Sequence, residues 1–223
     1  KVVMEQVPNT LALGLTSLFL SLAVGIPLGI FTALHRGTTI DRVVMGFAVF
    51  GFSMPNFFLG ILLMLFLSMS WQLLPSFGSG TIAHMVMPVL TLSLPSSGTM
   101  ARFARSSMLE VLNESYVRTA KAKGNPRRRR VYRHALPNAL IPIVTILGFR
   151  IGHLIAGAVI VETVFAWPGV GRLLVRSVSA GDLSVVQVIV LLTAITMIAA
   201  NLMVDYAYGL LDPRIRRRQR GNE

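Results

Sequence analysis

The segment from Glu110 to Pro137 reads EVLNESYVRTAKAKGNPRRRRVYRHALP and separates two long apolar runs. Ten Lys and Arg side chains lie between positions 102 and 134. Gly124-Asn125-Pro126 should stop a helix here, because glycine accepts a left-handed cap and proline cannot continue the hydrogen-bond ladder. A second helix should run from about Arg127 into the next apolar run. Apolar residues spaced three and four positions apart predict one apolar face on the first helix. They are Leu109, Leu112, Tyr116, Thr119 with Ala120, and the stem of Lys123.

Composition places the chain in a membrane. Of its 223 residues 53% are apolar and 13% are charged, whereas soluble domains carry about a quarter charged residues. The net charge of +12 could indicate nucleic acid, but the basic residues form patches between apolar runs too long for a soluble core. Beside a membrane, the run Arg127 to Arg130 fits anionic lipid headgroups, at ~1 kcal/mol per residue. We therefore expect membrane lipids and no nucleic acid as partners.

Five apolar runs predict an all-α polytopic membrane protein, since about 20 residues cross the hydrocarbon layer. A transmembrane domain over 1–212 and a basic cytoplasmic tail over 213–223 are expected. Gly25 and Gly29 predict a close helix–helix seam in the first span. The five expected spans are 8–34, 43–67, 85–103, 137–161 and 185–210.

Two of these spans carry interruptions. The second is broken by Ser53-Met54-Pro55-Asn56, and we expect its phenylalanines to be packing residues: Phe47, Phe50, Phe52, Phe57, Phe58 and Phe66. The third is expected to break at Pro88 and at Pro95-Ser96-Ser97-Gly98. Backbone carbonyls freed in a membrane helix need a neighbour or water, so Pro95 and Ser96 are candidates for lining a translocation path.

Charge predicts the orientation of the chain. The 35–42 loop, the 102–134 stretch and the tail from 212 hold 17 of the 21 Lys and Arg residues. The N-terminus, the 68–84 loop and the 162–182 loop hold 3. Because basic loops stay in the cytoplasm, we expect an outside start, five spans and an inside end.

The basic segment also resembles a known motif. Permease subunits of bacterial ATP-binding-cassette (ABC) importers carry a cytoplasmic loop that reads E-A-A, three residues, G, nine residues, I-x-L-P. Here the motif falls on Arg118-Thr119-Ala120, on Gly124 and on His134-Ala135-Leu136-Pro137, with departures at Arg118, Thr119 and His134. SYVRTAKAKG and HALPNALIP resemble the dipeptide, oligopeptide and nickel branch. The resemblance implies an ATPase-coupling loop over 106–136 with these residues: Glu114, Tyr116, Arg118, Thr119, Ala120, Lys121, Ala122, Lys123, Gly124, Leu136 and Pro137.

A second stretch, from Glu162 to Arg172, is similar to the ETVF-x-WPG-x-G signature of the same branch. Pro-Gly favours a turn, and Leu173 to Ser179 could form a short surface or re-entrant helix. The resemblance implies an external gate loop over 162–182, with Glu162, Trp167, Pro168, Gly169 and Gly171 as its residues.

What the resemblance implies is a permease subunit of an ABC importer in the bacterial inner membrane. One further N-terminal span is expected to be missing, since the chain opens on Lys1 rather than Met. The implied partners are a second homologous permease subunit, two cytoplasmic ATPase subunits and an external solute-binding protein, and the implied mechanism is alternating access. The cargo would be small peptides or, alternatively, a nickel or other metal chelate.

The chain itself is expected not to be an enzyme. It has no Gly-x4-Gly-Lys-Ser/Thr phosphate loop, so ATP and Mg²⁺ should bind to partner ATPases. No nucleophile–base pair suggests catalysis, and the four histidines are scattered rather than spaced as metal ligands. A stand-alone channel or ion-coupled transporter is disfavoured by the coupling-loop spacing and by the lack of an intramembrane carboxylate pair. A non-transporting anchor would not need that spacing.

Arg150 is the one formal charge well inside a predicted span. At 1.5 Å per residue it lies ~18–20 Å from either end of that span, and a central Arg costs at least ~2.5 kcal/mol to insert. It should therefore face a wet cavity or the bundle interior, with His153 on roughly the same side. Two interpretations stay open: Arg150 attracts an anionic group of the cargo, or it is satisfied by carbonyls freed at Pro88 or Pro95, or by the partner permease.

Overall fold

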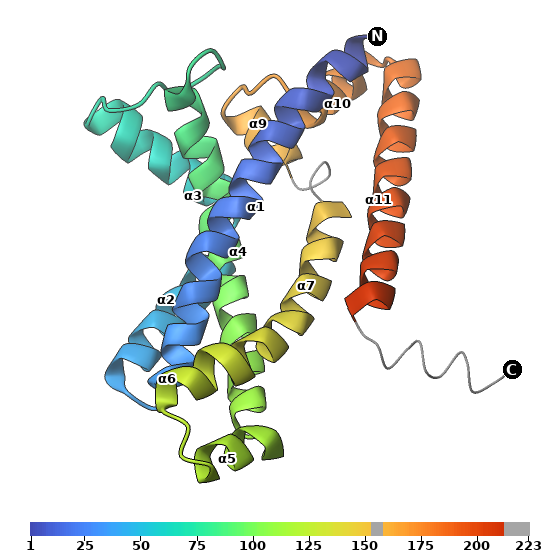
Figure 1. The fold of residues 1–223 in the computed structure, drawn as a ribbon. Coiled ribbons are helices and arrows are strands. Elements are labelled where there is room, and N and C mark those ends of the chain that lie inside the picture. The colour runs from blue at the N-terminus through green and yellow to red at the C-terminus, as the bar shows by residue number, and fades with distance from the viewer. Residues whose placement is uncertain (153–157, 212–223) are drawn as a thin grey trace, which may run out of the picture.

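The computed structural model describes residues 1–152 and 158–211, and every regular element in these two ranges is a helix. The longest are α1 (Val2–Leu34), α4 (Ile82–Leu112) and α11 (Leu183–Leu211). Figure 1 shows α1 and α4 running side by side through the length of the bundle, with α7 (Leu136–Gly152) and α11 beside them. The all-helical fold class is therefore confirmed.

The pairing of α1 with α4 is the most extensive contact between two helices. A Cβ atom at Gly25 would lie 2.6 Å from the Ser97 carbonyl oxygen, and one at Gly29 would lie 2.3 Å from that of Ala101. Only residues without a side chain allow backbones to approach this closely. The predicted small-residue seam of the first span is confirmed.

The second predicted span bends sharply. Helix α2 (Thr39–Ser53) ends before Pro55, and α3 (Asn56–Leu63) continues into a π-helical turn, η1 (Met64–Ser70), with a bend of 101° between the two halves. Proline removes a backbone donor and disfavours the helical conformation of the residue before it. The predicted interruption is therefore confirmed as a sharp bend, and α2 together with α3 and η1 forms a broken span or a re-entrant loop.

Helix α4, in contrast, is continuous through both of its prolines, so the predicted break at Pro88 and Pro95 is wrong. Hydroxyl groups supply extra hydrogen bonds to carbonyls in the same turns: Thr91 donates to Met87 O at 2.8 Å, and Thr99 donates to Pro95 O at 3.2 Å. Such local bonds, together with dense packing against α1, allow a membrane helix to tolerate proline.

Two of the helices are long and apolar enough to cross a membrane on their own: α1 and the stretch Leu183–Met203 of α11. The bent pair of α2 with α3 and η1 would be a third. The fourth predicted span is described only as far as Gly152 and again from Ala158, where a short helix α9 (Val159–Val164) follows. The count of five spans stays a prediction, and the predicted tail 213–223 lies outside the described residues.

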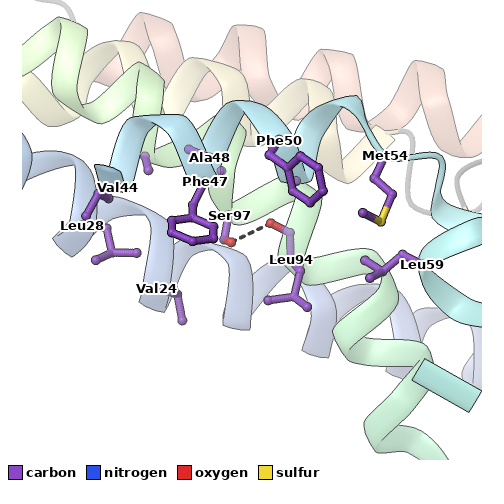
Figure 2. A pocket seen from close by; sticks show the side chains of 13 residues that line it. Val24, Leu28, Val44, Phe47, Ala48, Phe50, Met54, Leu59, Leu94 and Ser97 are labelled. Carbon is purple, nitrogen blue, oxygen red and sulfur yellow. Dashed lines mark hydrogen bonds between the residues drawn. The ribbon is translucent and has the colours of Figure 1, made fainter. Parts of the chain in front are cut away.

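The phenylalanines of the second span lie largely on the surface of this chain rather than in its core, which corrects the sequence prediction. All six are at least 46% exposed. On α2 the reason is that this helix meets α4 through small residues: a Cβ atom at Gly98 would lie 2.6 Å from the Ala48 carbonyl oxygen. Figure 2 shows Phe47 and Phe50 on the wall of an apolar groove of about 450 Å³ between α1, α2, α3 and α4. Packing within this single chain therefore leaves the aromatic surface formed by these phenylalanines exposed.

Candidate functional site

The predicted coupling segment forms a helix of its own. Helix α4 ends at Leu112, the chain turns at Asn113 and Glu114, and α5 runs over Ser115–Ala122. The prediction of one helix through 110–123 is therefore wrong. Figure 1 shows α5 projecting at one end of the bundle.

The stop signal at Gly124 is confirmed. Gly124 has φ +77°, in the left-handed region that favours glycine. Its N–H donates to Lys121 O at 3.0 Å, and the N–H of Asn125 donates to Ala120 O at 3.2 Å. After Pro126, α6 (Arg127–Arg129), the π-helical turn η2 (Arg130–Ala135) and α7 form one continuous helical path, as predicted.

The predicted inner face of α5 is confirmed at Ala120 and wrong at its other positions in this helix and the turn after it. Val117 and Ala120 are buried, whereas Tyr116, Thr119 and Lys123 are exposed, because the turn at 113–114 resets the helical phase after α4. Val117 joins a cluster of buried residues from α1, α4, η2 and α7: Ala33, Met108, Val131, Ala135 and Ala139.

The other face of α5 is exposed and mostly polar. Its exposed residues and those of the turn that follows are Glu114, Arg118, Thr119, Lys121, Ala122, Lys123 and Gly124. Of the two motif residues beyond the turn, Leu136 is half-buried and Pro137 is exposed. The segment therefore has a small apolar anchor and a broad basic surface.

Tyr116 of α5 lies beside Asn138 of α7, whose Nδ2 donates to His134 O at 2.9 Å. Partial burial and the nearby Glu114 carboxylate raise the pKa of Tyr116, and the neighbouring Asn138 side chain opposes that rise. This contact links the exposed segment directly to the first turn of a predicted span.

Two of the predicted path residues meet. Arg150 of α7 is half-buried, and its Nη1 donates to the Ser96 hydroxyl of α4 at 2.8 Å. Pro95 is buried next to this contact. The partner is thus a side-chain hydroxyl, not a carbonyl freed by proline. His153 lies outside the described residues.

The predicted gate loop caps the start of helix α10 (Val170–Ala180). The first four N–H groups of a helix lack partners within it. Here Gly169 N donates to Trp167 O at 2.9 Å, Val170 N to the Thr10 hydroxyl at 2.8 Å and Arg172 N to Glu162 Oε2 at 3.0 Å. Gly171 lies close to the same carboxylate. The start of α10 is therefore held by the loop and by Thr10.

Glycine is required at two positions of this loop. A Cβ atom at Gly169 would lie 2.2 Å from Glu162 Oε1, and one at Gly171 would lie 2.5 Å from the Cα of Val159. Glu162 itself is fully buried. Both positions need glycine for packing reasons, since the Glu162 carboxylate occupies the space for a side chain at Gly169 and Val159 occupies it at Gly171.

The loop is fastened to the first turns of α1. The Trp167 indole N–H donates to Asn9 O at 3.1 Å, and Asn9 Nδ2 donates to Pro168 O at 2.8 Å. Asn9 and Thr10 were not among the predicted site residues. The only sequence signal for them is a pair of polar residues at the start of an apolar run.

A second pair was also missed, at the end of the bundle where α5 lies. Arg105 of α4 donates to Asp41 of α2 at 2.7 and 2.8 Å, and the Asp41 side chain is 5% exposed. This bidentate hydrogen bond from Arg105 is the main cause that lowers the pKa of Asp41. The pair fixes the start of α2 against α4.

These features define a helical membrane transport protein with a polar segment at one end and a fastened loop at the other (Figure 1). The chain belongs to the family of binding-protein-dependent transport system inner membrane components, whose family model matches residues 25–217. It is a permease subunit of an ABC importer of the inner membrane, with a role in transport rather than catalysis.

Relatives and solved structures agree with this assignment. The chain is 39% identical over 249 residues to the dipeptide transport system permease protein DppB of Escherichia coli K12. The alignment covers 96% of this chain and 74% of that protein. It is 45% identical over 207 residues to the glutathione transport system permease protein GsiC of Salmonella choleraesuis, covering 93% of this chain and 68% of that protein.

The fold resembles that of two solved transporters. One is the MetNI methionine ABC transporter in inward-facing conformations, with a TM-score of 0.71 at 19% identity, covering 92% of this chain and 95% of the other. The second is an amino acid ABC transporter with histidines, with a TM-score of 0.70 at 18% identity and 92% of both chains covered.

Proposed function

We propose that this chain forms part of the translocation path for small peptides, as one of two permease subunits in an importer. The observation that carries the cargo class is the identity of 39% and 45%, over more than nine-tenths of the chain, to permeases named for a dipeptide and for glutathione. Because both of these cargoes are peptides, we favour a peptide over the alternative of a nickel or other metal chelate.

The proposed partners are a second homologous permease, two cytoplasmic ATPases that bind ATP and Mg²⁺, and an external solute-binding protein. The ATPase contact is assigned to the exposed face of α5. Val117 anchors this helix in a cluster shared with α1, α4, η2 and α7, and Ala120 is buried on the same face. A push on α5 would therefore reach four other elements, and packed interfaces of this kind switch between discrete arrangements.

At the other end, the loop that holds Trp167 and Glu162 is proposed to lie outside the cell. Its bonds to Asn9 and Thr10 support a rigid external gate that moves together with α1. Between the two ends, Arg150 beside Ser96 is proposed to line the path and to attract an anionic group such as a peptide carboxylate. In alternating access, the two ends would open in turn.

Uptake in cells tests the cargo class. A strain that lacks this permease should lose uptake of a radiolabelled dipeptide and regain it with the intact gene, while uptake of ⁶³Ni chelates should be the same in both strains. Restoration of nickel uptake without dipeptide uptake would show that the metal-chelate alternative is correct.

A further inference from the structure

A small basic pocket lies behind α5, at the end of the bundle where α1 and α4 end. Its volume is about 160 Å³. Arg127 and Arg130 line it together with five apolar residues of α1, α4, α5 and η2, and no carboxylate is among its lining residues. The pocket therefore combines positive charge with an apolar floor.

The two arginines differ in how they are satisfied. Arg127 Nη2 donates to Leu34 O, the last carbonyl of α1, at 2.8 Å. The Nε atom of Arg130 is buried and has no hydrogen-bond partner among the described residues. A buried donor on a cation without an acceptor is unfavourable. An anionic oxygen is the acceptor that satisfies a guanidinium best.

The position of the pocket indicates which anion is available. Its walls include Leu34, the last residue of a helix apolar and long enough to cross a membrane, and Leu112, the last residue of α4. The end of a spanning helix lies at the level of the lipid headgroups. Anionic headgroups there attract basic residues, and the apolar floor suits the glycerol and upper acyl region of a lipid.

We propose that this pocket binds the phosphate of an anionic phospholipid from the cytoplasmic leaflet, with Arg130 as its main ligand and Arg127 beside it. The inference rests on the orientation proposed above, which puts α5 in the cytoplasm. The bound lipid would fill the space between the end of α1 and the coupling segment. It would thus brace the element that is proposed to receive the push of the ATPases.

Lipid retention tests this site. The permease is purified from its own membrane in the assembly it forms there, and is placed in nanodiscs of phosphatidylcholine with a minor fraction of phosphatidylglycerol. Native mass spectrometry then counts the phosphatidylglycerol bound. Arg130→Gln should lower retained phosphatidylglycerol about fivefold, the share of one basic residue in headgroup attraction. Arg130→Lys, which keeps the charge, should retain most of it.

Arg128→Gln is the matched control, because it removes the same charge from an exposed neighbour that does not line the pocket. It should leave retention unchanged. Equal losses in the Arg128 and Arg130 variants would mean bulk charge attraction and would overturn the site, as would unchanged retention in Arg130→Gln. Release of the lipid by excess inorganic phosphate would assign the pocket to a free anion and overturn the lipid. The lipid count does not depend on transport, so a failed uptake assay leaves this test intact.

Discussion

Thr10 donates its hydroxyl hydrogen to Glu162 Oε1 across 2.6 Å, although 152 positions separate the two residues in the chain. The same Thr10 oxygen accepts the N–H of Val170 at 2.8 Å. One buried hydroxyl therefore joins the first turns of α1, the carboxylate of α9 and the start of α10. It makes the gate loop and α1 one structural unit.

Thr10→Val should weaken this unit while keeping its shape. The valine leaves the N–H of Val170 and one carboxylate oxygen without a partner, at a cost of about 1–3 kcal/mol. The melting temperature of the detergent-purified protein should fall accordingly. Thr16→Val is the matched control, since Thr16 is exposed on the same helix and bonds only within it, to Ala12 O. Equal melting temperatures for the two variants would contradict the cap.

The coupling segment leads to a second prediction. Gly124→Pro, or a scrambled order of residues 114–123, should leave the chain in the membrane but abolish co-purification of the ATPase subunits. The proline cannot adopt the φ of +77° that Gly124 requires, so α5 loses its end. A chain with its Arg128 and Arg129 changed to Gln serves as control, because it loses charge but keeps α5. Normal ATPase recovery with the scrambled segment would refute the coupling role.

The Asp41–Arg105 pair should make stability depend on pH. Because Arg105 lowers the pKa of Asp41 in the folded protein, the pair stabilises the fold above the unfolded-state pKa of about 3.9. That contribution is lost as pH falls through the lower folded-state pKa. Asp41→Asn should therefore lower the melting temperature at pH 7, and the gap to the unmodified protein should close below about pH 4.

The double variant with Arg105→Gln checks the cause. If the pair is responsible, Asp41→Asn should cost less once Arg105 is already changed. An equal cost in both backgrounds, or a gap that persists in acid, would assign the effect of Asp41 to the other contact of its side chain, the hydrogen bond that it accepts from Gly37 N.

Orientation can be tested by cysteine labelling, because the chain has no cysteine of its own. Cysteines at Ser76 and Ser179 should react with an impermeant maleimide added to intact cells, and cysteines at Thr38 and Gln219 should react only after lysis. The expectation follows from 17 basic residues in the loops predicted inside against 3 in those predicted outside. External labelling at Thr38 would overturn the five-span topology.

Local signals in the sequence predicted much of this molecule. The stop at Gly124, the short helix after the Pro-Gly turn and the seam at Gly25 and Gly29 each depend on backbone geometry that a few neighbouring residues determine. The phase of α5 was missed, because the apolar spacing from Leu112 to Tyr116 runs unbroken across residues 113–114, whereas the chain turns there and resets the helical period.

Long-range pairs could not be predicted from periodicity. Asp41 and Arg105 lie 64 positions apart, and each looks like an ordinary surface charge in its own segment. The phenylalanines of the second span were assigned to packing, but helical spacing does not reveal whether the surface they contact belongs to the same chain. Pro95 suggested a break, although α4 stays continuous where it packs against α1, a neighbour that is distant in the sequence.

Arg150 gives the last prediction. Its guanidinium donates to the Ser96 hydroxyl at 2.8 Å, so a neutral oxygen is the partner seen in the described residues. A neutral partner leaves the positive charge uncompensated, and an intramembrane charge of this kind marks a substrate path by default. Arg150→Gln keeps a hydrogen-bond donor for Ser96 but removes the charge. It should lower peptide uptake about tenfold or more, as expected for a lost charge-assisted bond of ~1.5–3 kcal/mol.

Assembly separates this role from a structural one. Arg150→Gln should still co-purify with its partners and keep basal ATPase activity, and Arg150→Lys should recover part of the uptake because it restores the charge. Ser96→Ala is the companion variant: it removes the hydroxyl but not the charge, so its effect on uptake should be smaller. If Arg150→Gln transports normally, or if the complex falls apart, Arg150 serves packing between α4 and α7 and does not attract the cargo.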